Sequence, residues 1–99
     1  MIRHIVTFKL ADESGGTRAS QAIWAAGQLT SLVPLIPEII SLTVVHDVHH
    51  DAGNSDFALI ADFADQAALD AYQAHPDHVR VTSTIRPLVA SRLAVDFEV

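Results

Sequence analysis

Apolar and polar side chains alternate along the first ten positions of the chain, which is the period of a β-strand with one buried face. A strand is therefore predicted over residues 2–10. The side chains expected to face the protein interior are Ile2, His4, Val6, Phe8 and Leu10. His4 is the one polar member of this face, which makes it a candidate wall of a pocket.

Residues 39–48 and 57–63 are rich in β-branched and apolar side chains, which favours two further strands. Gly53 and Asn54 lie between them in a turn-forming stretch, so the two strands are expected to pair as a hairpin. A fourth strand is predicted over residues 92–98, with Leu93, Val95 and Phe97 on one face and Arg92, Ala94, Asp96 and Glu98 on the other. We assign Leu93 and Val95 to the face of the sheet that the helices cover.

An alanine-rich segment after Thr17 has helical periodicity, and Thr17 is a suitable N-cap, so a helix is predicted from there to about Leu32. Pro34 and Pro37 follow and end it. Its apolar face is expected to consist of Ala19, Ala22, Ile23, Ala26, Leu29 and Val33. Trp24 falls nearly opposite this face, where it would be exposed as a contact surface unless the loop at residues 11–16 folds over it, and we expect the loop to do so.

Two shorter helices are predicted on either side of Pro76. Asp65 is a suitable N-cap for the first, over residues 66–75, and the second runs from Pro76 to about Arg86. Proline suits the first position of a helix, because the N–H that it lacks would be unpaired there. His75 is expected to cap the joint between the two helices.

The order strand, helix, strand, strand, two helices, strand is that of a split β-α-β unit repeated once. It predicts an α+β, ferredoxin-like fold in which a four-stranded antiparallel sheet carries helices on one face. Residues 1–99 are expected to form a single domain, because this length is close to the commonest domain size.

The uncovered face of such a sheet should be polar if it meets water. Here it is expected to be partly apolar, with Ile5, Val45 and Ile60 among Thr7, Thr43, Ala58 and Ala94. A second copy packed sheet against sheet would cover these side chains. A homodimer formed through the sheet face is therefore predicted.

Composition narrows the classes of partner and chemistry. The net charge is −6 and the six Lys and Arg residues are scattered, which argues against nucleic-acid binding. The chain has no cysteine, which excludes disulfides, thiolate catalysis and cysteine-based zinc sites. Charges interrupt the first segment, which resembles neither a signal peptide nor a membrane span. We expect a soluble, cytoplasmic protein that does not bind membranes.

Tyr72 and His78 lie on either side of the helical joint and are expected to lean toward one space, with His4 as a further wall. Histidine has an ordinary pKa of about 6.5 and can act as a general base near neutral pH, while a tyrosine hydroxyl can stabilise an enolate. The alternative is that Tyr72 fills the core and His78 packs in the first turn of its helix. Arg86 could contact a substrate carboxylate, although an ion pair with one of the chain's acids is expected.

The remaining histidines do not predict a metal site. His46, His49 and His50 are three apart or adjacent on an extended chain, so their side chains diverge. The sequence places no carboxylate with certainty beside His4 that could serve as a further metal ligand. We therefore predict no metal and no cofactor.

The chain resembles the stress-responsive α/β-barrel (Dabb) domain family. The matching segments are Ile2–Lys9, Asn54–Leu59, Ala71–Val79 and Val95–Phe97. The third contains Tyr72 followed by His75-Pro76-Asp77-His78, which is the most specific part of the match. The resemblance implies a ferredoxin-like fold whose sheets close into a dimeric α/β barrel.

Within the family, the chain is similar to plant polyketide cyclases of the olivetolic acid cyclase type, which perform an aldol cyclisation without cofactor or metal. The resemblance implies that His78 and Tyr72 are catalytic. It implies that His4 lines the substrate pocket. We predict three further substrate-binding residues: Val6 and Phe8 from the same strand face, and Ile23 from the first helix. The bulky aromatics on the first helix of those cyclases are absent here, so a different substrate is expected. Some members hold a cation through backbone carbonyls matching Val33, Ile36 and Ile39, but Pro34 departs from them and we predict none.

Two classes of function stay open at this point. The first is a cofactor-free cyclase or lyase, or a binder, for a small hydrophobic carbonyl-bearing or polyketide-like metabolite. The second is a non-catalytic stress-responsive structural or binding protein. An oxygenase that needs no cofactor is a third use of the same fold.

Overall fold

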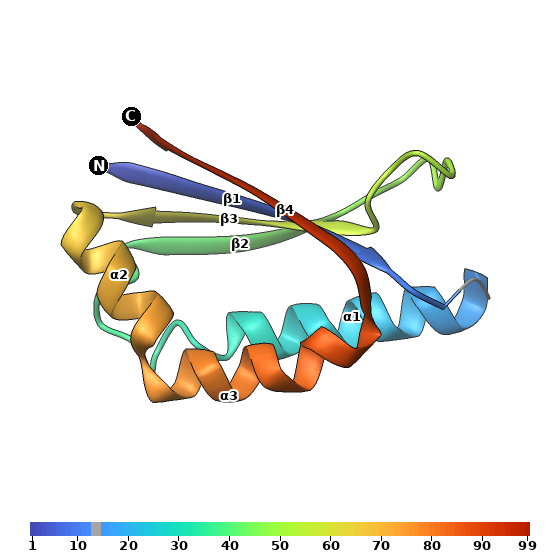
Figure 1. The fold of residues 1–99 in the computed structure, drawn as a ribbon, viewed down its shortest axis with the longest axis horizontal. Coiled ribbons are helices and arrows are strands. Elements are labelled where there is room, and N and C mark those ends of the chain that lie inside the picture. Colours follow the sequence, from blue (N-terminus) through green and yellow to red (C-terminus); the bar gives the residue numbers. More distant parts are fainter. Residues whose placement is uncertain (13–14) are drawn as a thin grey trace.

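The computed structural model describes residues 1–12 and 15–99. The elements along the chain are β1 (Ile2–Leu10), α1 (Gly15–Thr30), β2 (Ser41–His46), β3 (Phe57–Phe63), α2 (Gln66–Ala74), α3 (Pro76–Ile85), a 3₁₀ turn (Arg86–Leu88) and β4 (Val89–Glu98). The strands form one sheet in the order β2-β3-β1-β4, and each neighbouring pair is antiparallel. This is the ferredoxin-like α+β fold that the sequence predicts (Figure 1).

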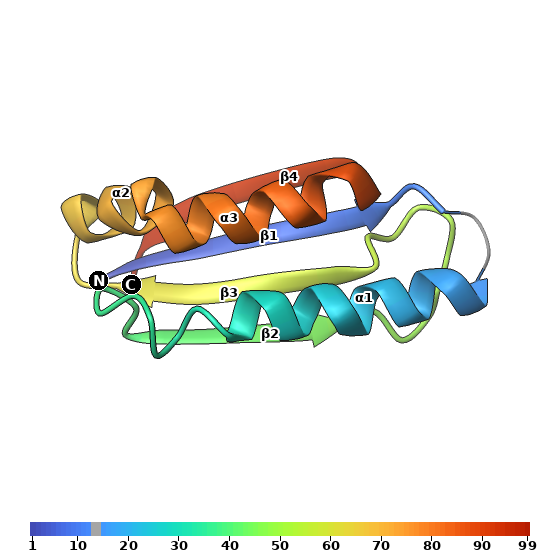
Figure 2. The same cartoon turned by 90° about the horizontal axis from the view of Figure 1, so that it is seen from below.

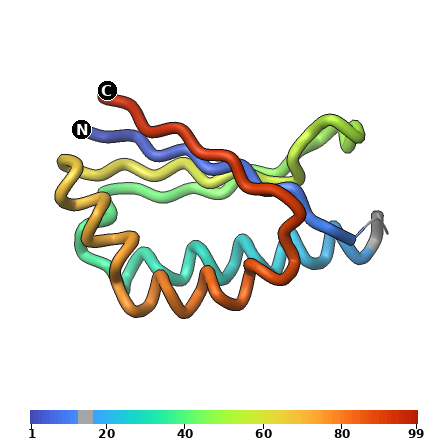
Figure 3. The backbone as a smooth tube through the Cα atoms, viewed as in Figure 1, coloured from blue at the N-terminus to red at the C-terminus, as the bar shows by residue number. Residues whose placement is uncertain are grey.

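All three α-helices lie on one face of the sheet, α1 beneath β2 and β3 and the α2–α3 pair beneath β1 and β4 (Figures 1 and 2). The core lies between these layers, and its largest fully buried side chains include Tyr72, Phe57 and Phe63. The two chain ends lie together at one end of the sheet (Figure 3), where the N–H of Val99 donates to the carbonyl of Met1 at 3.0 Å. Within residues 1–12 and 15–99, no helix is long and apolar enough to cross a membrane.

The joint between α2 and α3 has the predicted capping groups. The carboxylate of Asp65 accepts the N–H of Ala68 at the start of α2. His75 ends α2 in an extended conformation, and its Nδ1 accepts the N–H of Asp77 at 3.1 Å, so the same residue caps α3. Pro76 takes the first position of α3. The chain therefore turns sharply here, and the backbone N–H groups named above, which have no partner within their helices, are bonded to capping side chains.

Helix α1 is rotated relative to the sequence prediction. The helix begins at Gly15, so Thr17 lies inside it and is not the N-cap; residues 13–14 are outside the described part of the chain. The buried side chains of α1 are Ala22, Ala25 and Leu29, and the turns that follow the helix add Leu32 and Ile36. Ile23 is 69% exposed and Val33 43%, so both were wrongly assigned to the buried face. Trp24 lies opposite that face as its periodicity indicates, and it is 45% exposed. Alanines occur on several faces of this helix and do not favour one of them. The large side chains at and after its C-terminal end therefore determine which face packs against the sheet.

Strand β4 has the opposite orientation to the one predicted. Residues opposite each other in an antiparallel pair share a face, and Leu93 pairs with Thr7 while Val95 pairs with Ile5. Leu93 and Val95 therefore lie on the uncovered face, where they are 70% and 56% exposed. Ala94 pairs with Val6 and lies on the helix side, contrary to prediction. The prediction assigned the faces of this strand from hydrophobicity alone. Its pairing register with β1 determines which side chains face the helices.

The uncovered face of the sheet is consequently more apolar than predicted. We call the following side chains, which share this face by register, the back face: Ile5, Thr7, Thr43, Val45, Ala58, Ile60, Leu93, Val95 and Phe97. Arg3 and Asp62 lie near one end of it and form a two-pronged ion pair, with Nε–Oδ1 2.9 Å and Nη2–Oδ2 3.1 Å. The hydrogen bonds and charge of Arg3 lower the pKa of Asp62. An exposed apolar sheet of this kind is typical of an interaction surface.

Candidate active site

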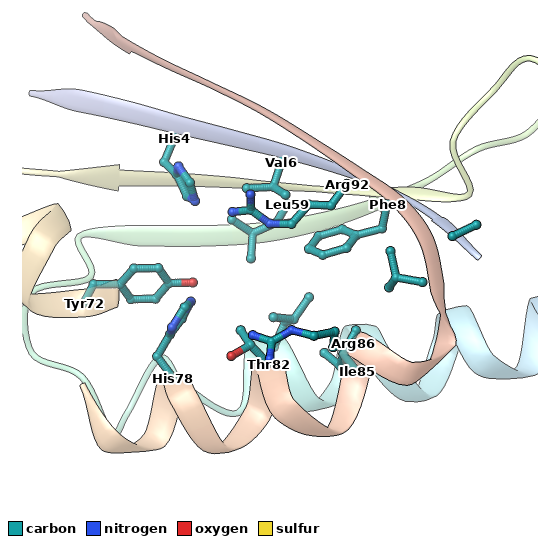
Figure 4. A pocket seen from close by; sticks show the side chains of 13 residues that line it. His4, Val6, Phe8, Leu59, Tyr72, His78, Thr82, Ile85, Arg86 and Arg92 are labelled. Atoms are coloured by element: carbon teal, nitrogen blue, oxygen red, sulfur yellow. The ribbon is translucent and has the colours of Figure 1, made fainter. Parts of the chain in front are cut away.

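A cavity of about 470 Å³ lies between the sheet and helix α3 (Figure 4). Its apolar walls include Val6, Phe8, Leu29, Leu59, Ile85 and Val89. Its polar lining consists of His4, Tyr72, His78, Thr82, Arg86 and Arg92. The volume and the mixture of apolar walls with a few polar groups are typical of a small-molecule site.

Tyr72 and His78 meet at one end of this cavity. Their ring centroids are 4.5 Å apart with an interplanar angle of 59°. Tyr72 comes from α2 and is only 1% exposed, whereas His78 comes from the first turn of α3 and is half-buried. The ring of His4, on β1, is 6.3 Å from that of Tyr72 in an edge-on arrangement. The three side chains that the sequence singles out therefore share one hollow.

The hydrogen bonding of His78 defines its tautomer. Its Nδ1 lies 3.1 Å from the carbonyl oxygen of Gln73. A carbonyl oxygen can only accept, so Nδ1 carries the proton and donates. In the neutral ring the lone pair is then on Nε2, which is the nitrogen that can take a proton from a ligand.

His4 is held in a similar way from the opposite wall. Its Nδ1 donates to the carboxylate of Asp96, which lies opposite it in the β1–β4 pair. The His4 side chain is buried, and Asp96 is half-exposed at the edge strand. A carboxylate partner of this kind fixes the orientation of the imidazole ring.

The surroundings shift the pKa of both groups at the Tyr72–His78 contact. Burial raises the pKa of Tyr72 to about 12, and the positive charge of Arg92 opposes this only in part. Tyr72 therefore keeps its hydroxyl proton at neutral pH. Burial also lowers the pKa of His78. The hydrogen bond to the Gln73 carbonyl opposes this in part, and the charges of His4, Arg92 and His75 add smaller contributions in the lowering direction. Neutral His78 and protonated Tyr72 are the states that a base and a hydrogen-bond donor require.

The family assignment follows from the sequence as a whole. The model of the stress responsive A/B barrel domain family, Dabb, matches residues 2–99. The chain belongs to this family. No curated protein matches it at comparable significance.

Three of the solved structures similar to this A/B barrel domain are described as dimeric. One is a dimeric ferredoxin-like protein of unknown function from Thermobifida fusca, 38% identical with a TM-score of 0.79, where the match covers 99% of this chain and 90% of the other. A dimeric protein of unknown function from Bacteroides fragilis is 24% identical with a TM-score of 0.88, covering 99% and 95%. A hydroxynitrile lyase from Passiflora edulis is 17% identical with a TM-score of 0.75, covering 99% and 92%, and this likeness shows the fold alone.

Most of the residues expected at the site of this A/B barrel domain do line the cavity. His4, Val6, Phe8, Tyr72 and His78 are all part of its lining. Ile23 is not, and lies instead in a separate hollow formed by α1 and the β2–β3 loop region. The rotation of α1 explains this difference, because the α1 residue that reaches the cavity is Leu29.

Two arginines also line the cavity. The sequence offered a substrate contact for Arg86, as the alternative to an ion pair, and none for Arg92. Arg92 was placed on the face away from the helices, but it pairs with Phe8 and so lies on the covered face. Arg86 was expected to pair with an acid, yet it has no ion pair with any residue that the structure describes. The strand register, if known, would have identified Arg92.

Metal binding has no evident centre in the described part of the chain. No three His, Cys, Asp or Glu side chains within residues 1–12 and 15–99 are grouped so that they could hold a metal ion.

His50 adopts a left-handed backbone conformation with φ of 58°, and its N–H donates to the carboxylate of Asp47 at 2.7 Å. That carboxylate also accepts the side-chain amide of Asn54, and these bonds order the β2–β3 loop.

Proposed function

We propose that the cavity binds a small apolar metabolite with a carbonyl group, of polyketide type, and that the protein catalyses a cofactor-free cyclisation or lyase reaction on it. His78 acts as the general base and Tyr72 as the hydrogen-bond donor. His4, Val6 and Phe8 contact the substrate. The observation that carries this proposal is the contact between a buried tyrosine and a neutral histidine whose Nε2 is free to accept a proton.

The chemistry requires one proton and one electron pair to move. Nε2 of His78 takes a proton from the carbon next to the substrate carbonyl, and the C–H electron pair becomes the enolate. The enolate oxygen accepts a hydrogen bond from the hydroxyl of Tyr72, whose raised pKa keeps that proton in place. In a cyclisation the enolate carbon attacks a second carbonyl of the same molecule, and the new alkoxide takes a proton from His78. A lyase reaction runs the same bond changes in reverse.

We also propose that the chain is a homodimer in which two back faces pack together. The description of related structures as dimeric supports this. The exposure of Leu93, Val95 and Phe97 supports it independently, because burying these apolar side chains in an interface is favourable in free energy. The cavity lies on the opposite side of the sheet, so a dimer of this kind leaves it accessible.

Hydrogen–deuterium exchange on a simple ketone tests the catalytic proposal. Phenylacetone has acidic C–H groups, and their replacement by deuterium is followed by proton NMR in D₂O. We expect the protein to accelerate exchange and His78→Gln to abolish the acceleration while the melting temperature stays within a few degrees. Val79→Ala is the matched control, because Val79 is exposed on the same helix and lies outside the cavity. Equal exchange with both variants, together with a loss of stability in His78→Gln, would favour the non-catalytic alternative.

A further inference from the structure

Two of the six cationic side chains differ from the others. Arg3, Arg18 and Arg80 each form an ion pair with an aspartate, and Lys9 donates to the carbonyl of Ala52. The guanidinium groups of Arg86 and Arg92 form neither a hydrogen bond nor an ion pair within the described residues. Both residues are exposed, so their guanidinium groups are free to bind a ligand from solvent.

Both unpaired arginines belong to the cavity described above. Arg86 comes from the 3₁₀ turn that follows α3 and Arg92 from β4, so they approach from opposite walls. Figure 4 shows both guanidinium groups turned along the cavity toward the end that holds His4, Tyr72 and His78. No Asp or Glu is among the described residues that line it. The lining therefore contains two guanidinium groups and no carboxylate, and the carboxylate of Asp96, behind His4, is bound to that imidazole.

We propose that the substrate is an acid, and that Arg86 and Arg92 together bind its carboxylate. This inference rests on the proposed function, since it assigns the substrate class of the same site. Guanidinium groups bind carboxylates through paired hydrogen bonds, and two of them on facing walls fix both the position and the direction of the ligand. The carboxylate is held on the arginine side, and the rest of the molecule extends toward Tyr72 and His78.

A carboxylate suits this cavity better than a phosphate does. Phosphate sites usually use free N–H groups at a helix N-terminus. At the start of α3 this device is missing, because Pro76 has no N–H and the N–H of Asp77 already donates to His75. The side chain of Asp77 adds a negative charge at the same position. The other walls are aliphatic and aromatic, which favours the apolar body of an organic acid.

Binding of a matched pair of ligands tests the assignment. The probes are 3-benzoylpropanoate and its primary amide, which have nearly the same shape and differ in charge. Isothermal titration calorimetry at low salt is expected to show the acid binding about tenfold more tightly than the amide, as a charged hydrogen bond in place of a neutral one implies. Arg86→Gln and Arg92→Gln should each weaken binding of the acid about tenfold and leave the amide unchanged. Arg80→Gln is the control, because Arg80 lies on α3 outside the cavity and pairs with Asp77.

The outcomes separate this inference from the proposed function. If acid and amide bind equally, or if Arg80→Gln has the same effect as the two cavity variants, the carboxylate assignment is wrong. Exchange on phenylacetone, which is neutral, would still report on His78 in that case. If phenyl phosphate binds more tightly than 3-benzoylpropanoate, the anion class is wrong. Arg92→Lys keeps the charge and is expected to retain part of the preference for the acid, which a purely structural role of Arg92 would not produce.

Discussion

The phenol ring of Tyr72 contacts the imidazole ring of His78 with centroids 4.5 Å apart, although the two residues belong to different helices. The contact exists because the chain breaks at His75 and restarts at Pro76, which directs the end of α2 and the start of α3 to the same end of the cavity. A continuous helix would place residues six apart on different faces. The joint is therefore the feature that assembles the candidate site.

Removal of the Tyr72 hydroxyl should affect catalysis and not stability. Tyr72→Phe is expected to lower the exchange rate on phenylacetone about 10²-fold, the usual effect of losing one oxyanion donor. The ring stays in the core, so the melting temperature should remain unchanged. Tyr72→Ala removes the ring as well and should cost roughly 3–5 kcal/mol of unfolding free energy. If Tyr72→Phe exchanges as fast as the natural protein, Tyr72 is a packing residue only.

Activity should depend on pH through His78. Its pKa is lowered from the ordinary 6.5, so the neutral, basic form predominates at pH 7. We expect the exchange rate to rise with pH, to be half-maximal below pH 6.5 and to be level above it. Because the charge of Arg92 contributes to this lowering, Arg92→Gln should move the midpoint upward. A rate that falls as pH rises through this range would contradict the role of His78 as the base.

Stability should depend on pH through the same residue. The folded pKa of His78 lies below its unfolded value, so the unfolded state binds more protons between the two values. The free energy of unfolding is therefore level above pH 6.5 and falls as pH drops through the folded pKa. Urea denaturation of the natural protein and of His78→Gln measures this difference. The variant should lose part of the decline, and an identical decline in both proteins would show that His78 does not cause it.

A charge on the back face should break the proposed dimer. Leu93→Glu places a carboxylate on the back face, which we expect to be buried between two copies. Sedimentation velocity should find the natural protein as a dimer and this variant as a monomer. Val48→Glu is the control, since Val48 is 79% exposed and lies in the β2–β3 loop. A monomeric natural protein would contradict the proposal.

Several parts of the site could be predicted from sequence because local rules determine them. Strand alternation placed His4, Val6 and Phe8 on one face, and the preference of proline for the start of a helix located the joint between Tyr72 and His78. Arg92 could not be placed in this way, because its face depends on the pairing of β4 with β1, which is a long-range contact. Ile23 was misplaced because an alanine-rich helix has apolar positions on several sides, and only packing of Leu29, Leu32 and Ile36 selects one.

The state of the His78 ring at neutral pH is the most direct test of the proposed mechanism. Nitrogen-15 NMR of the histidine-labelled protein distinguishes a protonated ring nitrogen from one that carries a lone pair. At pH 7 we expect Nδ1 of His78 to be protonated and Nε2 to be unprotonated, in accordance with the bond to the Gln73 carbonyl and the lowered pKa. A proton on Nε2 at this pH, in a neutral or a charged ring, would leave the cavity without its base and would contradict the account.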